Sequence, residues 1–234
     1  MVKKNEPIEA QEMTESLNKS EAFFLKYKKV IIAVIAALIL LIVGYMLVNE
    51  YVLEPREKEA STALAKGQDL FNAQQYDKAL KGDGAQFGGL LKVATDYSGT
   101  DAGNLANLYI GLCYAHQEKA DWKKAMEYVE KFDTQSDQLI SPASQMALGD
   151  IYANNDQLDK AVESFKKAAD MADSKAEDKV NLSIAPIALR KAGVILESQG
   201  KKADAHAIYE QIKEKYLNSP VRQDIDKYLE RTAE

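Results

Sequence analysis

The chain has 234 residues, a formal net charge of -6, one cysteine and two histidines. An acidic balance without a basic stripe argues against nucleic-acid binding, and a single cysteine excludes an internal disulfide. Neither histidine lies in an HExxH motif or beside paired cysteines, so the sequence carries no metal-binding motif. We therefore expect a protein that is not an enzyme, with no catalytic site, no cofactor, no metal and no small-molecule substrate.

The first predicted element is an uncharged run of twenty residues, 30–49, built mainly from Val, Ile, Ala and Leu. At a rise of about 1.5 Å per residue it is about 30 Å long, which matches the hydrocarbon core of a bilayer. The polar segment before it is too long for a signal peptide, and no small-x-small cleavage site follows it. The sequence therefore predicts one transmembrane helix that the mature protein retains.

The charges on either side of this run predict its orientation. Three lysines directly precede it, and the first charges after it are acidic: Lys26, Lys28, Lys29, Glu50 and Glu54. Lysine and arginine are enriched on the cytoplasmic side of a membrane. We therefore predict a cytoplasmic tail, residues 1–29, and a domain outside the membrane, residues 50–234, which in the inner membrane of a bacterium is periplasmic. Residues 1–18 are polar and of mixed charge, so we expect them to be disordered.

The first soluble helix is predicted to run to about Gln75, and its partner helix is interrupted by a glycine-rich segment, KGDGAQFGG, at 81–89. No Gly-Lys-Ser or Gly-Lys-Thr follows these glycines, so a phosphate-binding loop is disfavoured. We favour a structural turn. Two alternatives stay open, which are an anion cradle and a loop that carries Phe87 into a contact.

Three further helix pairs are predicted over residues 104–133, 142–171 and 186–217. The third unit of the domain carries the most regular tetratricopeptide spacing, at Leu148, Gly149, Tyr152, Leu158, Ala161, Phe165 and Ala168. Small residues at fixed positions let two helices approach closely, and stacked pairs form a curved solenoid. The predicted fold is all-α, with one N-terminal transmembrane helix, a tetratricopeptide-repeat α-solenoid and a C-terminal capping helix over residues 221–231.

In such a solenoid the first helix of each pair lines the concave wall, which is a natural groove for a peptide or helix. The predicted partner-binding groove consists of Leu105, Leu108, Leu112, His116, Met146, Asp150, Asn154, Arg190, Val194 and Glu197. Leu108 and Leu112 stand where repeats that capture C-terminal carboxylates carry Lys and Asn, so the wall favours an apolar partner segment. Alternatively, the leucines pack against the first helix pair or the final helix and leave no groove.

The lysine-flanked anchor, the interrupted first pair, the regular repeats and the closing KYLNSP segment, Lys215–Pro220, together resemble the YfgM-type proteins of Gram-negative inner membranes. The resemblance runs from about Glu21 to the end of the chain. It implies a periplasmic repeat domain that associates with Sec translocon subunits and with periplasmic folding factors such as a membrane-anchored prolyl isomerase. We expect a membrane-anchored adaptor or chaperone that assists unfolded exported chains. The alternative is a scaffold subunit of an envelope-assembly or division complex.

Overall fold

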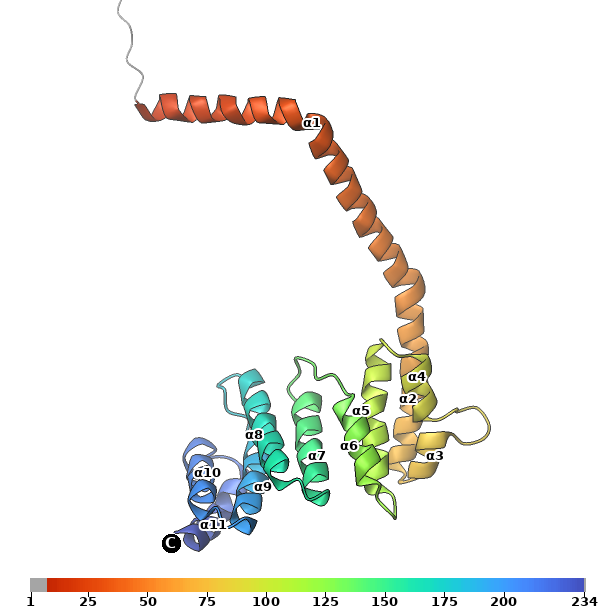
Figure 1. Cartoon of the computed structure of the whole chain (residues 1–234), viewed down its shortest axis with the longest axis vertical. Helices are drawn as coiled ribbons and strands as arrows, with labels where there is room; N and C mark the ends of the chain where they lie inside the picture. The colour runs from red at the N-terminus through yellow and green to blue at the C-terminus, as the bar shows by residue number, and fades with distance from the viewer. Residues whose placement is uncertain (1–7, 234) are drawn as a thin grey trace, which may run out of the picture. The chain divides into compact units, whose positions relative to one another are not determined.

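The structure, a computed structural model, describes residues 8–233, with side chains described at 21, 23 and 25–233. Every regular element in this range is helical (Figure 1). The predicted all-α fold is therefore confirmed for these residues. The chain divides into two compact units, residues 1–55 and residues 56–234, and each is described by itself.

The first unit is built around α1 (Ile8–Val48), which is followed by a π-helical turn, Asn49–Leu53. Its apolar segment is fully exposed, and by length and composition it is the one helix among residues 8–233 that could cross a membrane. That part of the sequence prediction is confirmed. The helix already begins at Ile8, so the expected disorder is wrong for residues 8–18, whereas residues 1–7 lie outside the described range.

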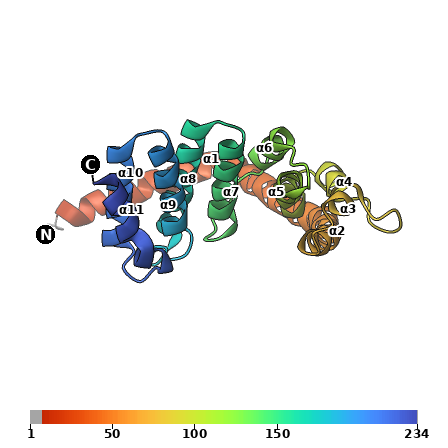
Figure 2. The ribbon, with the colours of Figure 1, turned by 90° about the horizontal axis from the view of Figure 1, so that it is seen from below.

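The second unit is a row of helices in which consecutive elements pack against one another. Its elements are α2 (Glu54–Asn72, from Arg56 onward), α3 (Tyr76–Lys81), α4 (Leu90–Asp96), α5 (Asp101–His116), α6 (Trp122–Glu130), α7 (Ile140–Asn154), α8 (Leu158–Lys175), α9 (Ala185–Ser198), α10 (Lys202–Lys215), a 3-10 turn (Pro220–Asp224) and α11 (Ile225–Thr232). Figure 2 shows this row from below, with the helices following in chain order. The helices therefore stack largely on their neighbours in sequence.

One contact recurs where the first helix of a pair meets the second. In four places a helical glycine faces a large side chain of the partner helix: Gly67 and Leu90, Gly111 and Val129, Gly149 and Phe165, Gly193 and Tyr209. A Cβ atom on Gly149 would lie only 2.6 Å from the Phe165 ring. Because a side chain there would collide with a buried ring, the close approach requires glycine. The close approach that the sequence analysis predicted for small residues at fixed positions, such as Gly149, is confirmed.

The glycine-rich segment at 82–89 closes on itself. The Asp83 carboxylate accepts hydrogen bonds from the amides of Ala85, Gln86 and Phe87, at 2.9 to 3.2 Å, and these bonds lower the pKa of Asp83. Gly82 has φ of +98°, and a Cβ there would strike the Phe87 carbonyl oxygen. The Phe87 side chain is buried in the core of the first pair. The segment is thus a structural turn that also carries Phe87 into a contact, as two of the three alternatives expected. The third alternative was an anion cradle, but the amides that could form it bind the Asp83 carboxylate.

Apart from the segment at 82–89, the connections between helices lie at two opposite edges of the row (Figure 1). The loop edge holds the connections between pairs, at 97–100, 131–139, 176–184 and 216–219, and the turn edge holds the turns within pairs, at 73–75, 117–121, 155–157 and 199–201. Polar side chains cap the helices that start at the loop edge. The oxygens of Thr100, Asp137 and Asn181 accept hydrogen bonds from amides in the first turns of α5, α7 and α9.

Candidate functional site

A pocket of about 230 Å³ lies between α5 and α7 and includes one residue of α2. We call it the apolar pocket. Its lining residues are Gln68, Leu105, Leu108, Tyr109, Leu112, Ile140, Ala143, Ser144 and Ala147. Three of the predicted groove residues, the leucines of α5, therefore converge on one cavity.

The leucines lie at different depths in this pocket. Leu105, Leu108 and Leu112 are spaced by three and four residues, which places them on one face of α5. Leu108 is only 6% exposed and belongs to the core, whereas Leu105 and Leu112 are half-buried. Each of the two alternatives for these leucines therefore describes part of the face. Leu108 packs in the core, whereas Leu105 and Leu112 remain accessible from the pocket.

The α7 side of the apolar pocket is formed by small side chains. Ala143 and Ala147 face the leucines, and the Ser144 hydroxyl is used within its own helix, where it donates to the Ser141 carbonyl at 2.8 Å. Small-molecule sites usually occupy about 300 to 1,000 Å³. The apolar pocket is smaller than that and suits one or two side chains of a partner segment.

His116 lies outside the apolar pocket. Its ring stacks on Tyr76 with centroids 5.8 Å apart and meets Phe71 edge-on at 6.1 Å. These rings come from α2, α3 and α5, so His116 helps to join the first two pairs. The sequence favoured a polar surface or packing role for this histidine over a metal-binding one, and the structure shows packing against two aromatic rings.

The predicted wall residues of α7 are mostly paired within the chain. Lys191 of α9 donates to the Asp150 carboxylate, with Nζ 2.7 Å from Oδ1, and the Asn154 side chain donates to the Asp150 carbonyl at 2.8 Å. Met146 is half-buried against the core. This part of the wall links α7 to α9 through an ion pair and does not extend the apolar pocket.

The last part of the predicted wall meets the C-terminal helix. The Glu197 carboxylate accepts hydrogen bonds from the Tyr209 hydroxyl at 2.5 Å and from the Arg231 guanidinium of α11 at 3.0 Å. Arg190 is half-buried and Val194 is 42% exposed, and neither lines the apolar pocket. Glu197 therefore serves the packing of α9, α10 and α11.

The sequence prediction placed Ala143 on the groove wall but missed five other lining residues of the apolar pocket, namely Gln68, Tyr109, Ile140, Ser144 and Ala147. Ile140, Ala143 and Ala147 show the spacing of one helix face. The predicted unit began at residue 142, but the Asp137 carboxylate caps the helix and α7 begins at Ile140. An aspartate three residues before Ile140 is the signal that would have placed Ile140 on that face.

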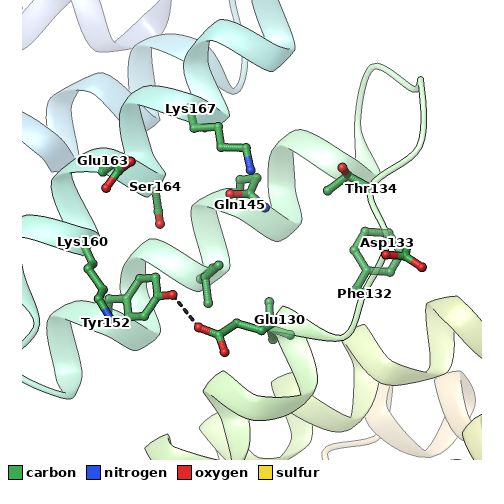
Figure 3. Close-up of a pocket in the computed structure, with 12 residues that line it drawn as sticks. Glu130, Phe132, Asp133, Thr134, Gln145, Tyr152, Lys160, Glu163, Ser164 and Lys167 are labelled. Atoms are coloured by element: carbon green, nitrogen blue, oxygen red, sulfur yellow. Dashed lines mark hydrogen bonds between the residues drawn. The ribbon is translucent and has the colours of Figure 1, made fainter.

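A second pocket, of about 500 Å³, lies between α6, α7 and α8 on another face of α7 (Figure 3). We call it the polar pocket. Its lining residues are Val129, Glu130, Phe132, Asp133, Thr134, Gln145, Leu148, Tyr152, Lys160, Glu163, Ser164 and Lys167. Acidic and basic side chains alternate around it, so it presents no field of one sign.

The central contact of the polar pocket joins Tyr152 and Glu130. The Tyr152 hydroxyl donates to Glu130 Oε1 at 2.5 Å, as the dashed line in Figure 3 marks, and the Lys160 ammonium lies 5.3 Å from the Tyr152 ring centroid. Burial and the bond to Glu130 raise the pKa of Tyr152 to about 12. The phenol is therefore protonated at neutral pH and acts as a hydrogen-bond donor between α7 and α6.

The remaining candidates for chemistry in the sequence are metal ligands and the single cysteine. Among the residues searched within the described range, no three His, Cys, Asp or Glu side chains gather in a way that could hold a metal. Cys113 is fully buried, and its burial raises the pKa of the thiol to about 12. A thiol with so high a pKa is unreactive, so Cys113 packs as a small apolar group.

Comparisons of the chain with protein-family models, with curated proteins and with solved structures give no match. The likeness to YfgM-type proteins and to tetratricopeptide repeats therefore stands on the sequence pattern.

Proposed function

We propose that this protein is a membrane-anchored adaptor that binds an apolar segment of another protein in the apolar pocket. One observation carries the proposal. Leucines of α5 that the repeat spacing assigns to a concave wall line a cavity whose opposite side is formed by alanines. A cavity with apolar walls and small residues on one side is completed when a partner inserts its own side chains.

The proposed architecture is a tetratricopeptide-repeat solenoid capped by α11. Two observations support it, namely the recurring contact between a helical glycine and a large side chain, and the packing of each helix on its neighbours in sequence. The Arg231 side chain reaching Glu197 favours a capping role for α11. A solenoid of this kind would present the apolar pocket on its concave wall.

The proposed location is the bacterial inner membrane, crossed once by α1, with the N-terminus cytoplasmic and the second unit periplasmic. The lysines before the apolar run and the acidic residues after it support this topology. The resemblance to YfgM-type proteins favours Sec translocon subunits, a periplasmic prolyl isomerase and unfolded exported chains as partners. The alternating charges of the polar pocket speak against a nucleic acid.

The proposed interaction is transient. Burying one leucine-sized side chain contributes about 1.5 to 3 kcal/mol. Association costs about 4 to 15 kcal/mol in lost freedom of motion. Two inserted side chains therefore offset only part of that cost, and the anchor compensates by raising the local concentration of the protein at the membrane.

The test is site-specific photo-crosslinking in native membranes. The photoreactive residue belongs at Leu112, which is half-buried, because Leu108 is part of the core. A matched control carries it at Lys167, an exposed position in the polar pocket. We expect Leu112, but not Lys167, to capture translocon subunits, a folding factor or several exported chains.

Other outcomes would overturn this proposal. One stable envelope protein captured in fixed proportion at Leu112 would favour the scaffold function instead. Capture of the chain's own residues alone would mean that the apolar pocket is only a packing defect. Equal capture at Leu112 and Lys167 would show that the contacts are unspecific.

A further inference from the structure

The exposed apolar side chains of the second unit are unevenly distributed. Five large ones are exposed in the described part of this unit, and four of them lie in or directly beside the loop edge: Leu139 at 64%, Ile140 at 46%, Leu182 at 39% and Leu217 at 66%. The fifth, Val194, lies on α9. Single exposed leucines are common on protein surfaces, but their concentration at one edge requires an explanation.

The opposite edge differs in composition. The turns within pairs read AQQ, QEKAD, NDQ and QGK, at 73–75, 117–121, 155–157 and 199–201. Among the described residues, the turn edge exposes no large apolar side chain. The two edges of one row of helices are therefore apolar and polar, respectively.

The leucines of the loop edge are held in place by helix caps. Asp137 Oδ1 accepts hydrogen bonds from the amides of Leu139 and Ile140, at 2.8 and 2.5 Å. Asn181 Oδ1 accepts from Ser183 at 3.0 Å, directly after Leu182. Because the backbone is fixed at both places, these leucines are presented to the surroundings by an ordered loop.

Polar contacts near this edge also tie the loop at 131–139 to neighbouring helices and join two helices to each other. Asn104 donates to the Asp133 carbonyl at 2.8 Å, and Gln138 donates to the Lys175 carbonyl at 2.8 Å. At the last pair, Lys215 pairs with the buried Asp173 at 2.5 Å. These contacts hold the helix ends together along the loop edge.

The chain enters the second unit at this same edge. The Arg56 guanidinium donates to the carbonyls of Asp96 and Ser98, at 2.9 and 3.3 Å, and the Glu57 carboxylate accepts from the amide of Asp101 at 2.8 Å. Leu53, the last apolar residue after α1, precedes Arg56 by three residues, which span about 10 Å at most. Covalent connection thus keeps one end of the loop edge close to the end of the apolar segment.

We propose that the loop edge rests on the surface of the bilayer from which the apolar helix emerges, with Leu139, Ile140 and Leu182 inserted into the lipid interface. The inference rests on the proposed role of α1 as a membrane anchor. Lipid is the favoured occupant because the chain that follows the apolar helix enters the second unit at this edge, and because the exposed leucines stand on separate, successive loops.

The charges beside Leu182 indicate which lipids the loop edge would contact. Glu177, Asp178 and Lys179 precede Leu182 in the same loop, so the loop edge is not basic and its contact with lipid does not require anionic headgroups.

Ile140 lies directly beside the loop edge and also lines the apolar pocket. The apolar pocket therefore opens beside the bilayer surface, where it can receive an apolar segment that leaves the membrane.

The test places single spin labels on the full chain in phosphatidylcholine vesicles. Buried Cys113 has a raised pKa, so the unchanged protein is expected to take up no label and serves as the background. Labels go on Leu139→Cys and Leu182→Cys at the loop edge, with Glu118→Cys and Lys202→Cys, which are exposed near the turn edge, as matched controls. Circular dichroism checks that each labelled variant keeps its helices.

The readout compares the collision of each label with oxygen, which concentrates in lipid, and with a water-soluble nickel complex. We expect labels at 139 and 182 to collide more with oxygen than with nickel, at a depth of about 5 Å into the interface. Labels at 118 and 202 should show the reverse. Adding phosphatidylglycerol to the vesicles should leave the depth of positions 139 and 182 unchanged.

The outcomes separate this inference from the proposed anchor. A chain that floats with vesicles but shows water-exposed labels at 139 and 182 would overturn the lipid contact and leave the anchor intact. A chain that fails to float would overturn the anchor itself. Labels shielded from both oxygen and nickel would indicate that a protein covers the edge, which would also overturn the lipid contact.

Discussion

The apolar pocket and the polar pocket share helix α7 but differ in what fills them. On one face, Ala143 and Ala147 leave space opposite leucines and supply no polar group. On another face, Tyr152 is bonded to Glu130 and covered by Lys160. The two pockets therefore differ in chemistry as well as in size. The larger pocket contains side chains that already have partners, whereas the smaller one can be completed by a side chain from outside the protein.

The largest expected effect is the loss of stability when the α7–α8 contact is broken. Phe165→Ala removes a fully buried ring that packs on Gly149 and leaves a cavity in the core. We expect a loss of about 3 to 5 kcal/mol in the free energy of unfolding, measured by urea denaturation followed by circular dichroism. The exposed neighbour Lys166→Ala is the control, and a similar loss there would show that the method does not report this contact.

A smaller effect is expected at the polar pocket when its central hydrogen bond is removed. Tyr152→Phe should cost about 1 kcal/mol at neutral pH, because Glu130 is exposed and regains water as its partner. The same urea titration measures this loss. A cost near zero would mean that the bond contributes nothing to the packing of α6 and α7.

The pH dependence of the same bond has a defined sign. The pKa of Tyr152 is raised from 10 to about 12, so its contribution is fully present below pH 10 and is lost as the pH rises towards 12. Tyr152→Phe should therefore lose less stability over this range than the unchanged protein. Glu130→Gln should lower the pKa of Tyr152, measured by phenolate absorbance, and an unchanged pKa would contradict the assigned role of the carboxylate.

Filling the apolar pocket should affect binding far more than stability. Ala147→Leu places a side chain where the partner is proposed to insert, so capture at Leu112 should fall sharply. The free energy of unfolding should change by about 0.5 kcal/mol or less if the space is open. A loss of about 1 to 3 kcal/mol would instead indicate an already packed core.

The smallest effect is expected at the rim of the polar pocket. Lys167 is exposed there, and Lys167→Ala should change neither the free energy of unfolding, within about 0.5 kcal/mol, nor the capture at Leu112. The same two assays as for Ala147→Leu are used, so the variants form a matched pair. A fall in capture equal to that of Ala147→Leu would make the polar pocket part of the binding site.

Much of the fold was predictable because it depends on local periodicity. The spacing of Gly149 and Phe165 indicated which residues meet across a helix pair, and that contact is present. The site was less predictable. Repeat spacing grouped His116 and Glu197 with the α5 leucines, but His116 packs on Tyr76 and Glu197 binds Arg231. Such partners lie in helices remote in sequence, and the repeat spacing carries no information about them.

The sequence by itself determined the long apolar helix, the helical pairing and the glycines where helices touch, because each depends on residues within about two helical turns or on a repeated spacing. Only the tertiary structure decided how the leucines differ. Leu108 is core while Leu112 is half-buried, although both face the pocket that Ile140 and Ala147 line from α7. Tertiary packing likewise left Leu139 and Leu182 exposed at one edge, since no neighbouring helix covers the capped loops that carry them.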